Sequence, residues 1–195
     1  MYEVKNVSRE TMIALKRYQS LILKWNKTIN LVSYKSAGEL WSRHILDSLQ
    51  LMQYIDELNI HLVDVGSGGG FPGVVLSIAG VQNVTLVESD TRKSIFLAQA
   101  AKICDNKINI INQRIETLDL NCDILTSRAC SPLKKFFSYT QNIKVKAKYL
   151  LLKGQEYQKE IDEAQKKWSF YYLTYDSISS KNSKILEINN VKNIA

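Results

Sequence analysis

From residue 61 to the end of the chain, short apolar runs alternate with segments whose apolar residues recur at helical spacing. The runs that predict strands cover 61–66, 84–89, 108–112, 122–128, 148–153, 170–178 and 184–189. The segments that predict helices cover 72–79, 91–104, 132–143 and 156–167. Such alternation is typical of βαβ units, so it predicts an α/β fold with a mostly parallel sheet of about seven strands and helices on both faces.

Two connections depart from this alternation. Residues 113–121 leave room for little more than a turn, so we expect no full helix there. No helical pattern separates the last two predicted strands, and we expect them to pair antiparallel.

The N-terminal part of the chain predicts helices instead of strands. Residues 8–26 carry apolar side chains at helical spacing, and Ser8 is placed to cap the first turn. A second amphipathic helix is predicted over 37–57. We therefore expect one domain over residues 1–195, with 1–58 as a helical extension and 59–195 as a Rossmann-like core.

The stretch DVGSGGGFPG, Asp64 to Gly73, follows the first predicted strand. Glycines at this point let a ligand approach the main chain, and three ligand classes compete. A phosphate-binding P-loop requires a lysine where Val74 stands, so that reading fails. A dinucleotide fingerprint requires a third glycine where Phe71 stands, which weakens this second reading without excluding it.

The third reading is the pattern Asp-x-Gly-x-Gly-x-Gly, met by Asp64, Gly66, Gly68 and Gly70. This pattern looks like the first motif of the class I S-adenosylmethionine-dependent methyltransferases. Glu88 closes the second predicted strand, where a carboxylate can accept both hydroxyls of a ribose. Both nucleoside-binding folds use such an acid, so Glu88 supports a nucleoside cofactor without choosing between them.

The net charge of +7 is concentrated near the C-terminus. Residues 131–195 contain 12 lysines against 6 acids. An uneven basic surface of this kind favours a polyanionic partner such as nucleic acid, although a solvated lysine-rich face has the same composition.

The cysteines and the hydropathy exclude several classes. Three cysteines without a CxxC pair argue against a disulfide framework and against a zinc site, so no metal is expected. No apolar run is long enough for a membrane span, and the first residues do not resemble a secretory signal. We expect a cytoplasmic protein that works as a monomer.

Several strings, taken together in their order and spacing, resemble the bacterial ribosomal RNA guanine-N7 methyltransferases, a family also called glucose-inhibited division protein B. The strings are WNKTINLVS (25–33), RHILDSL (43–49), DVGSGGGFPGVVLSIA (64–79), VESDTRKSIFL (87–97), TSRA (126–129) and LLLKG (150–154). The resemblance covers residues 20–154. Beyond it, the last part of the chain matches the family only in its pattern of strands.

The resemblance implies a function, a cofactor and a set of contacts. The family methylates N7 of a guanine in the 530 loop of 16S ribosomal RNA with S-adenosylmethionine, so the expected partner is that RNA or the small ribosomal subunit. Carried over by motif, the cofactor contacts fall on Gly66, Phe71, Ile115, Glu116 and Arg128. With the acids and the rest of the turn, the predicted cofactor residues are Asp64, Gly66, Ser67, Gly68, Phe71, Glu88, Ile115, Glu116 and Arg128.

The implied chemistry needs no general base, because N7 of guanine already carries a lone pair. The site must instead hold the reacting atoms in line at close range. His44 and Arg128 are candidates for positioning the substrate. The TSRA string stands where amine-methylating enzymes of this fold carry Asn/Asp-Pro-Pro-Tyr/Phe, and Cys130 does not follow a proline, so neither adenine-N6 nor cytosine-C5 methylation is favoured.

RNA is expected to approach across basic residues, chiefly Arg43, Lys134, Lys135 and Lys153. A splayed guanine could stack on an aromatic ring, for which Phe71 and Phe136 are the candidates. The alternatives are a methyltransferase for another RNA, a protein or a small molecule, a non-catalytic RNA-binding module of the same fold, and a nicotinamide oxidoreductase.

Overall fold

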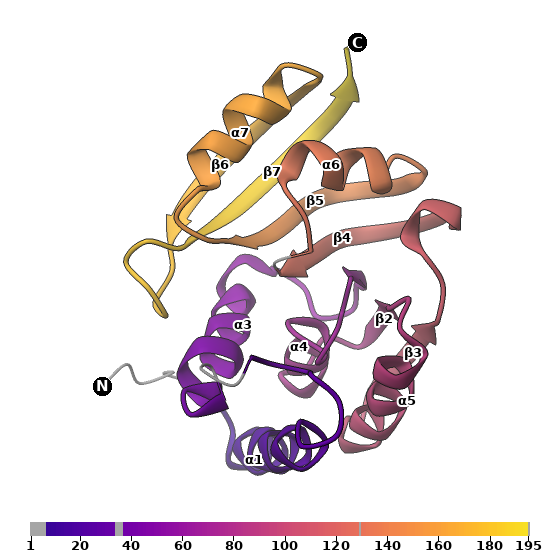
Figure 1. Cartoon of the computed structure of the whole chain (residues 1–195), viewed down its shortest axis with the longest axis vertical. Helices are drawn as coiled ribbons and strands as arrows, with labels where there is room; N and C mark the ends of the chain where they lie inside the picture. Colours follow the sequence, from indigo (N-terminus) through magenta and orange to yellow (C-terminus); the bar gives the residue numbers. More distant parts are fainter. Residues whose placement is uncertain (1–6, 34–36, 129, 195) are drawn as a thin grey trace.

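The structure, a computed structural model, describes residues 7–33, 37–128 and 130–194. The first six residues, on which the expectation about a secretory signal partly rests, lie outside the described residues, as does Ala129 of the TSRA string. The described chain forms one seven-stranded sheet with helices on both faces, as the alternation of patterns predicts (Figure 1).

The strand order in the sheet is β3-β2-β1-β4-β5-β7-β6. The strands are β1 (His61–Val65), β2 (Asn83–Val87), β3 (Lys107–Ile111), β4 (Leu120–Arg128), β5 (Ile143–Lys153), β6 (Trp168–Asp176) and β7 (Lys184–Asn193). Strands β1 to β5 pair in parallel, whereas β7 is antiparallel to both β5 and β6. The chain runs outward from β1 to β3 and then returns to the other side of β1. The carboxyl ends of β1 and β4 therefore form the switch point, where open sheets of this kind bind ligands.

Two layers of helices bury the two faces of the sheet. The main helices are α1 (Arg9–Trp25), α4 (Gly73–Ile78), α5 (Thr91–Ala100), α6 (Leu133–Tyr139) and α7 (Tyr157–Gln165). Helices α1, α4 and α5 share one apolar cluster with the sheet, and α6 and α7 share the other (Figure 1). Side chains of successive strand residues alternate between these clusters, for example Leu62 and Val63, because a strand turns its side chains to opposite faces.

Most predicted elements are confirmed within two residues. Ser8 caps α1 and accepts a hydrogen bond from the amide of Thr11. Pro72 and Pro132 stand immediately before α4 and α6, where a missing amide proton costs nothing. The segment between β3 and β4 holds only the 3₁₀ turn η4 (Ile115–Thr117), as expected. The last two strands pair antiparallel.

The helix predicted over 37–57 is confirmed only in part. Helical residues follow one another without a gap from Trp41 to Tyr54, but they form a π-helical turn η1 (Trp41–Leu46), a short α3 (Asp47–Leu49) and a 3₁₀ segment η2 (Gln50–Tyr54). A π turn inserts a residue and rotates the side chains that follow it. The polar side chains of Asp47, Ser48 and Gln50 are buried here, in positions that an apolar stripe does not predict.

Strand β5 starts at Ile143, five residues before the predicted start at 148, and α6 ends at Tyr139. The segment IKVKAK alternates apolar residues with lysines, and its burial alternates in part. A period of two marks a half-buried strand. The prediction missed this part of the strand, because it used only the continuous apolar residues from 148 onward and not the alternation with lysines before them.

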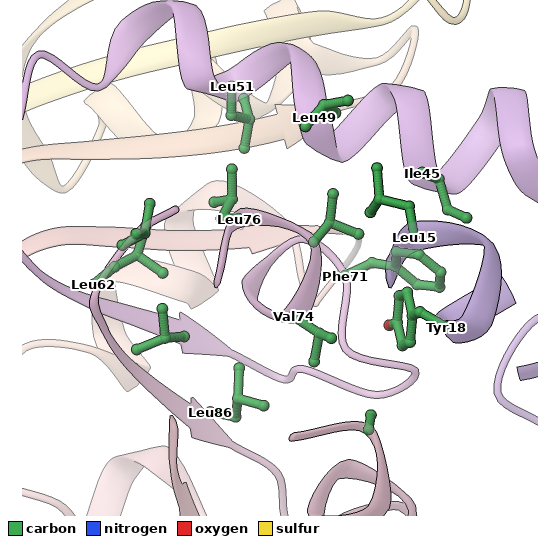
Figure 2. Close-up of a cluster of buried hydrophobic side chains, with 14 of the residues drawn as sticks. Leu15, Tyr18, Ile45, Leu49, Leu51, Leu62, Phe71, Val74, Leu76 and Leu86 are labelled. Carbon is green, nitrogen blue, oxygen red and sulfur yellow. The ribbon is translucent and has the colours of Figure 1, made fainter. Parts of the chain in front are cut away.

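The glycine turn between β1 and α4 is packed tightly against α1. The Tyr18 hydroxyl on α1 donates a hydrogen bond to the carbonyl of Gly69, and both residues are buried. The rings of Tyr18 and Phe71 lie 5.5 Å apart, and Figure 2 shows them facing one another among the core side chains. The N-terminal helix thus supports the turn from behind.

Gly73, the first residue of α4, marks the closest approach of helix and sheet. A Cβ atom at this position would lie 2.8 Å from Oδ2 of Asp64 on β1 and in collision with Leu86 on β2. The close helix–strand contact that a dinucleotide fold places at its third glycine therefore falls two residues after Phe71.

We predict that Gly73→Ala lowers the free energy of unfolding by about 2–3 kcal/mol, because the extra methyl group overpacks a buried contact. Urea unfolding measures the change. The matched control is Gly154→Ala, since a Cβ at Gly154 meets no heavy atom of the described chain within 4 Å. Equal losses in the two variants would contradict the packing argument.

Candidate active site at the carboxyl edge of the sheet

The glycine turn crosses the carboxyl ends of β1 and β2. The amides of Gly66 and Ser67 donate to the carbonyl of Val87 at 2.9 and 3.1 Å. Gly66 has a φ of +68°, and a Cβ there would lie 2.9 Å from Sγ of Cys130. A side chain at this position is excluded both by the left-handed conformation and by the neighbouring loop, so the main chain of the turn stays open to a ligand.

Glu88, directly after β2, faces this turn. Its Oε2 accepts from the amide of Gly68 at 2.8 Å and its Oε1 accepts from the amide of Asp90 at 2.8 Å. A carboxylate has about four acceptor sites, so each oxygen retains one. The acid is therefore held rigidly, with capacity for two further donors such as vicinal hydroxyls.

A cavity of about 200 Å³ lies beside these groups. Its lining combines main chain of the turn, an acid and an apolar side chain from η4. The lining residues are Val65, Gly66, Val87, Glu88, Ser89, Gln113, Arg114, Ile115, Glu116, Cys130 and Tyr139. The structure thus brings together Gly66, Glu88, Ile115 and Glu116, which the sequence placed in one site. An apolar residue beside a carboxylate suits the base and the ribose of a nucleoside.

Asp64 lies beneath the turn and is fully buried. Its Oδ2 accepts from the amide of Gly73 at 3.1 Å, while Oδ1 has no hydrogen-bond partner within the described chain. Burial raises the pKa of Asp64 to about 7. Ser67 is also buried, and its hydroxyl donates to the carbonyl of Asp64 at 2.9 Å. Both residues shape the turn from below, and neither belongs to the lining of the 200 Å³ cavity.

A second, larger cavity of about 850 Å³ adjoins the first, because Cys130 lines both. Its walls come from the N-terminal segment, the loop after β4, the end of β5 and the β6–β7 loop, and include Leu31, Val32, Arg43, His44, Asp47, Arg128, Ser131, Pro132, Leu152, Lys153, Gly154, Glu160, Ser179, Ser180 and Ser183. This cavity has both apolar and polar walls and carries charges of both signs. Two adjacent cavities of different chemistry suit the transfer of a group between two ligands.

Arg128 ends β4 and forms part of the larger cavity. Its guanidinium lies over the ring of Phe71, 4.9 Å from the centroid, and Nη1 donates to the carbonyl of Arg43 at 3.4 Å. Burial lowers the pKa of Arg128, while Asp47, Tyr18 and Asp64 act in the opposite direction. The Phe71 ring thus supports the guanidinium through a cation–π contact.

His44 packs against the same ring, with centroids 5.1 Å apart. The imidazole is buried, and both ring nitrogens lack a hydrogen-bond partner among the described residues. Burial first, and then the charges of Arg128 and Arg43, lower the pKa of His44 to about 3. The ring is therefore neutral at any physiological pH.

The predicted stacking role of Phe71 and Phe136 is wrong. Their side chains are 2% and 1% exposed, and each ring belongs to a core cluster. An RNA base cannot reach either ring without opening the core. Figure 2 shows Phe71 enclosed by residues of α1 and α4.

The basic residues fall into two groups. Arg43, Lys134 and Lys135 are exposed, as predicted. Lys153 is not on an open surface, because its side chain is 8% exposed and its ammonium binds Glu160 at 2.7 Å and the carbonyl of Ser131 at 2.9 Å. Within residues 7–33, 37–128 and 130–194, six lysines of the basic C-terminal part have an acid at ion-pair distance, namely Lys146, Lys148, Lys153, Lys159, Lys166 and Lys184.

Asp47 is a buried acid in the wall of the larger cavity that the sequence reasoning missed. The signal was an acid directly after the apolar pair Ile45 and Leu46 in the string RHILDSL. In the described part of the chain, no helix is long and apolar enough to cross a membrane, and no three histidine, cysteine or acidic side chains form a group that could hold a metal ion.

Comparison with families and curated proteins gives consistent matches. The family model described as GidB, rRNA small subunit methyltransferase G, matches residues 11–189. Ribosomal RNA small subunit methyltransferase G of Rickettsia prowazekii (strain Madrid E) is 58% identical over 188 residues, which are 96% of this chain and 98% of that protein. The protein of the same name from Rickettsia typhi (strain ATCC VR-144 / Wilmington) is 56% identical over the same shares of the two chains.

Solved structures agree in fold. The magnesium protoporphyrin IX methyltransferase of Synechocystis PCC 6803, solved with bound SAM, has a TM-score of 0.59 at 12% identity, covering 95% of this chain and 99% of that chain. A ribosomal protein L11 methylase from Lactobacillus delbrueckii subsp. bulgaricus has a TM-score of 0.60 at 14% identity, covering 74% and 76%. At such low identity these likenesses concern the fold alone.

The two buried titratable groups oppose one another in their effect on stability. The pKa of His44 falls on folding from 6.5 to about 3, so its contribution to stability is lost as the pH falls below 6.5. The pKa of Asp64 rises on folding from 3.8 to about 7, so its contribution is gained as the pH falls below 7. In the wild type the two effects largely cancel over this range.

We predict that Asp64→Asn removes this cancellation. Between about pH 7.5 and about pH 5 the variant should lose on the order of 2 kcal/mol of unfolding free energy relative to the wild type. Urea unfolding at the two pH values measures the difference. His44→Leu should shift the pH dependence in the opposite direction, and parallel curves for all three proteins would contradict the assignment.

Proposed function

The chain belongs to the rRNA small subunit methyltransferase G family, and we propose that it methylates N7 of a guanine in the 530 loop of 16S ribosomal RNA. The cofactor is S-adenosylmethionine, which supplies a methyl group activated by a sulfonium centre. Family membership decides against the nicotinamide oxidoreductase. The observation that best supports the finer proposal is that two cavities meet at Cys130, one suited to a nucleoside and the other lined by charged residues of both signs.

The residues of the smaller cavity fit the cofactor. The open main chain at Gly66 and Gly68, with Ser67 buried beneath it, admits the amino-acid part of the cofactor. Glu88 retains acceptor sites for the ribose hydroxyls, and Ile115 offers an apolar surface for the adenine.

Further cofactor residues act from the edges of the site. Glu116 adjoins Ile115 in the lining, where its main chain is available to the base edge. Asp64 has an unpartnered Oδ1 behind the turn, which favours a positive ligand group above it. Arg128, held over the Phe71 ring, can bind a carboxylate or a phosphate at the boundary between the two cavities.

The protein's task in this reaction is positioning. N7 of guanine needs no deprotonation, and the thiol of Cys130, an exposed residue, is not activated, because desolvation raises its pKa. The base is oriented against Arg128 and His44, which both contact the Phe71 ring. His44 is neutral and buried there. Alignment of the reacting atoms accounts for a large share of the acceleration in such a transfer.

The proposed partner is 16S ribosomal RNA or the small ribosomal subunit, approached across Arg43, Lys134 and Lys135. Lys153 supports the same wall through its ion pair with Glu160. We propose that the protein acts as a cytoplasmic monomer and that residues 1–195 form one methyltransferase domain. Residues 1–58 belong to it functionally, because they provide one wall of the larger cavity.

Transfer of a tritiated methyl group to small subunits that lack the modification tests this proposal. The expected result is label on one guanine in the 530 loop, identified by the strand cleavage that N7-methylguanine permits after reduction and aniline treatment. Label on ribosomal protein, on another base or on metabolites, or no label, would refute it. Bulk cell protein and a metabolite extract serve as parallel acceptors.

We predict that Glu88→Gln weakens the binding of S-adenosylhomocysteine about tenfold, because hydrogen bonds to a charged acceptor are roughly twice as strong as neutral ones. Isothermal titration calorimetry measures the dissociation constant. Glu163→Gln, an exposed site on α7 paired with Lys166, is the matched control. Unchanged binding by the Glu88 variant would remove this residue from the site.

A further inference from the structure

Asp47 occupies an unusual position for an acid. Its side chain is 8% exposed and lines the cavity of about 850 Å³, together with His44 one turn earlier. The π turn η1 directly precedes it, and single π turns in helices are frequent at functional sites. The residue is therefore both buried and turned toward the cavity where the substrate is proposed to bind.

Donors from η2 and from the distant β6–β7 loop hold this carboxylate in place. Oδ1 accepts from Nε2 of Gln50 at 2.7 Å, from the hydroxyl of Ser177 at 3.0 Å and from the hydroxyl of Ser179 at 2.6 Å. Gln50 completes the network by accepting from the amide of Ile178 at 2.8 Å. All bonds from described residues to the side chain end on Oδ1, so Oδ2 is the oxygen left for a ligand.

No lysine or arginine of the described chain lies within ion-pair distance of Asp47. Buried acids are rarely kept without a paired cation. The three neutral donors hold the carboxylate in place, while Arg128, whose pKa burial lowers and Asp47 raises, lines the same cavity. A carboxylate presented in this way to a cavity suits a ligand that brings hydrogen-bond donors.

We propose that Asp47 recognises the target guanine by accepting hydrogen bonds from its N1–H and N2 amino groups; this rests on the proposed function. Among the bases, guanine alone presents these two donors side by side, and proteins read an extruded base along this edge. N7 lies on the opposite side of the ring. A carboxylate that holds the Watson–Crick edge therefore directs N7 away from itself, toward the neighbouring cavity.

The charge of Asp47 also matches the course of the reaction. The lone pair of N7 forms the new bond to carbon, and the electron pair of the broken S–C bond remains on sulfur. One positive charge thereby passes from the sulfonium to the purine, and it makes N1–H and the amino group stronger donors. Their bonds to a carboxylate strengthen as the transition state forms, which is the condition for faster transfer.

A purely structural role would use the same network, since Asp47 joins the β6–β7 loop to the N-terminal segment. The two roles differ in one measurable property, the discrimination between guanine and inosine. Inosine keeps N7, O6 and N1–H but lacks the amino group. Asp47→Asn keeps an oxygen for the three donors and replaces the other oxygen with a donor.

The experiment compares guanine with inosine at the labelled position of a 16S ribosomal RNA fragment assembled by ligation. Wild type should show a kcat/KM about tenfold or more higher for guanine. In Asp47→Asn the kcat/KM for guanine should fall about tenfold to hundredfold and the guanine-to-inosine ratio should approach one. Binding of the same fragments with S-adenosylhomocysteine present, followed by fluorescence anisotropy, should lose its preference for guanine in parallel.

The matched control is the double variant Ser177→Ala/Ser179→Ala, which loosens the network but keeps the carboxylate. It should retain the wild-type ratio. A wild type that does not discriminate inosine, an Asp47→Asn variant that keeps the ratio, or a serine variant that loses it would each overturn the inference. Failure of the proposed function is distinct, because the wild type would then label no guanine at all.

Discussion

The close contact between the glycine turn and the elements around it is the constraint on which the site depends. Gly73 lets α4 approach β1 and β2, and Asp64 ties the start of α4 to the sheet. The Tyr18 hydroxyl holds the turn from the α1 side through Gly69. A side chain at either glycine or a loss of α1 would move the main chain that the cofactor approaches. The N-terminal helices therefore support the turn directly and provide one wall of the proposed site.

The two sides of this site are held together by different kinds of interaction. The proposed cofactor side is made of main chain and of a Glu88 carboxylate fixed by two amides, all from segments close in the sequence. The substrate side is built from three remote segments and depends on a ring, Phe71, that carries Arg128 and His44 on its surface. The first arrangement recurs wherever a nucleoside binds an open α/β sheet. The second has to be specific to one acceptor.

The same distinction explains how much the sequence could predict. The turn, Glu88 and the α1 cap follow local rules of glycine conformation, strand ends and capping, and the structure agrees with them. The change of helix type within 37–57 accompanies the burial of Asp47 against Ser177, 130 residues further along the chain, which local sequence rules cannot predict. The prediction that Lys153 lies on an open RNA-binding surface is wrong for the same reason. Its ion pair with Glu160 forms only when α7 folds back onto β5.

The pairing of lysines in the C-terminal part changes what the net charge of +7 means for an RNA partner. Of the 12 lysines in residues 131–195, six already neutralise a neighbouring acid. Only cations that displace condensed counterions from phosphates contribute to the salt dependence of nucleic-acid binding, each adding roughly one unit or less to the logarithmic slope. Association with RNA should accordingly weaken with ionic strength far less steeply than the composition suggests. A larger share of the binding free energy then comes from shape complementarity and from contacts with the extruded base.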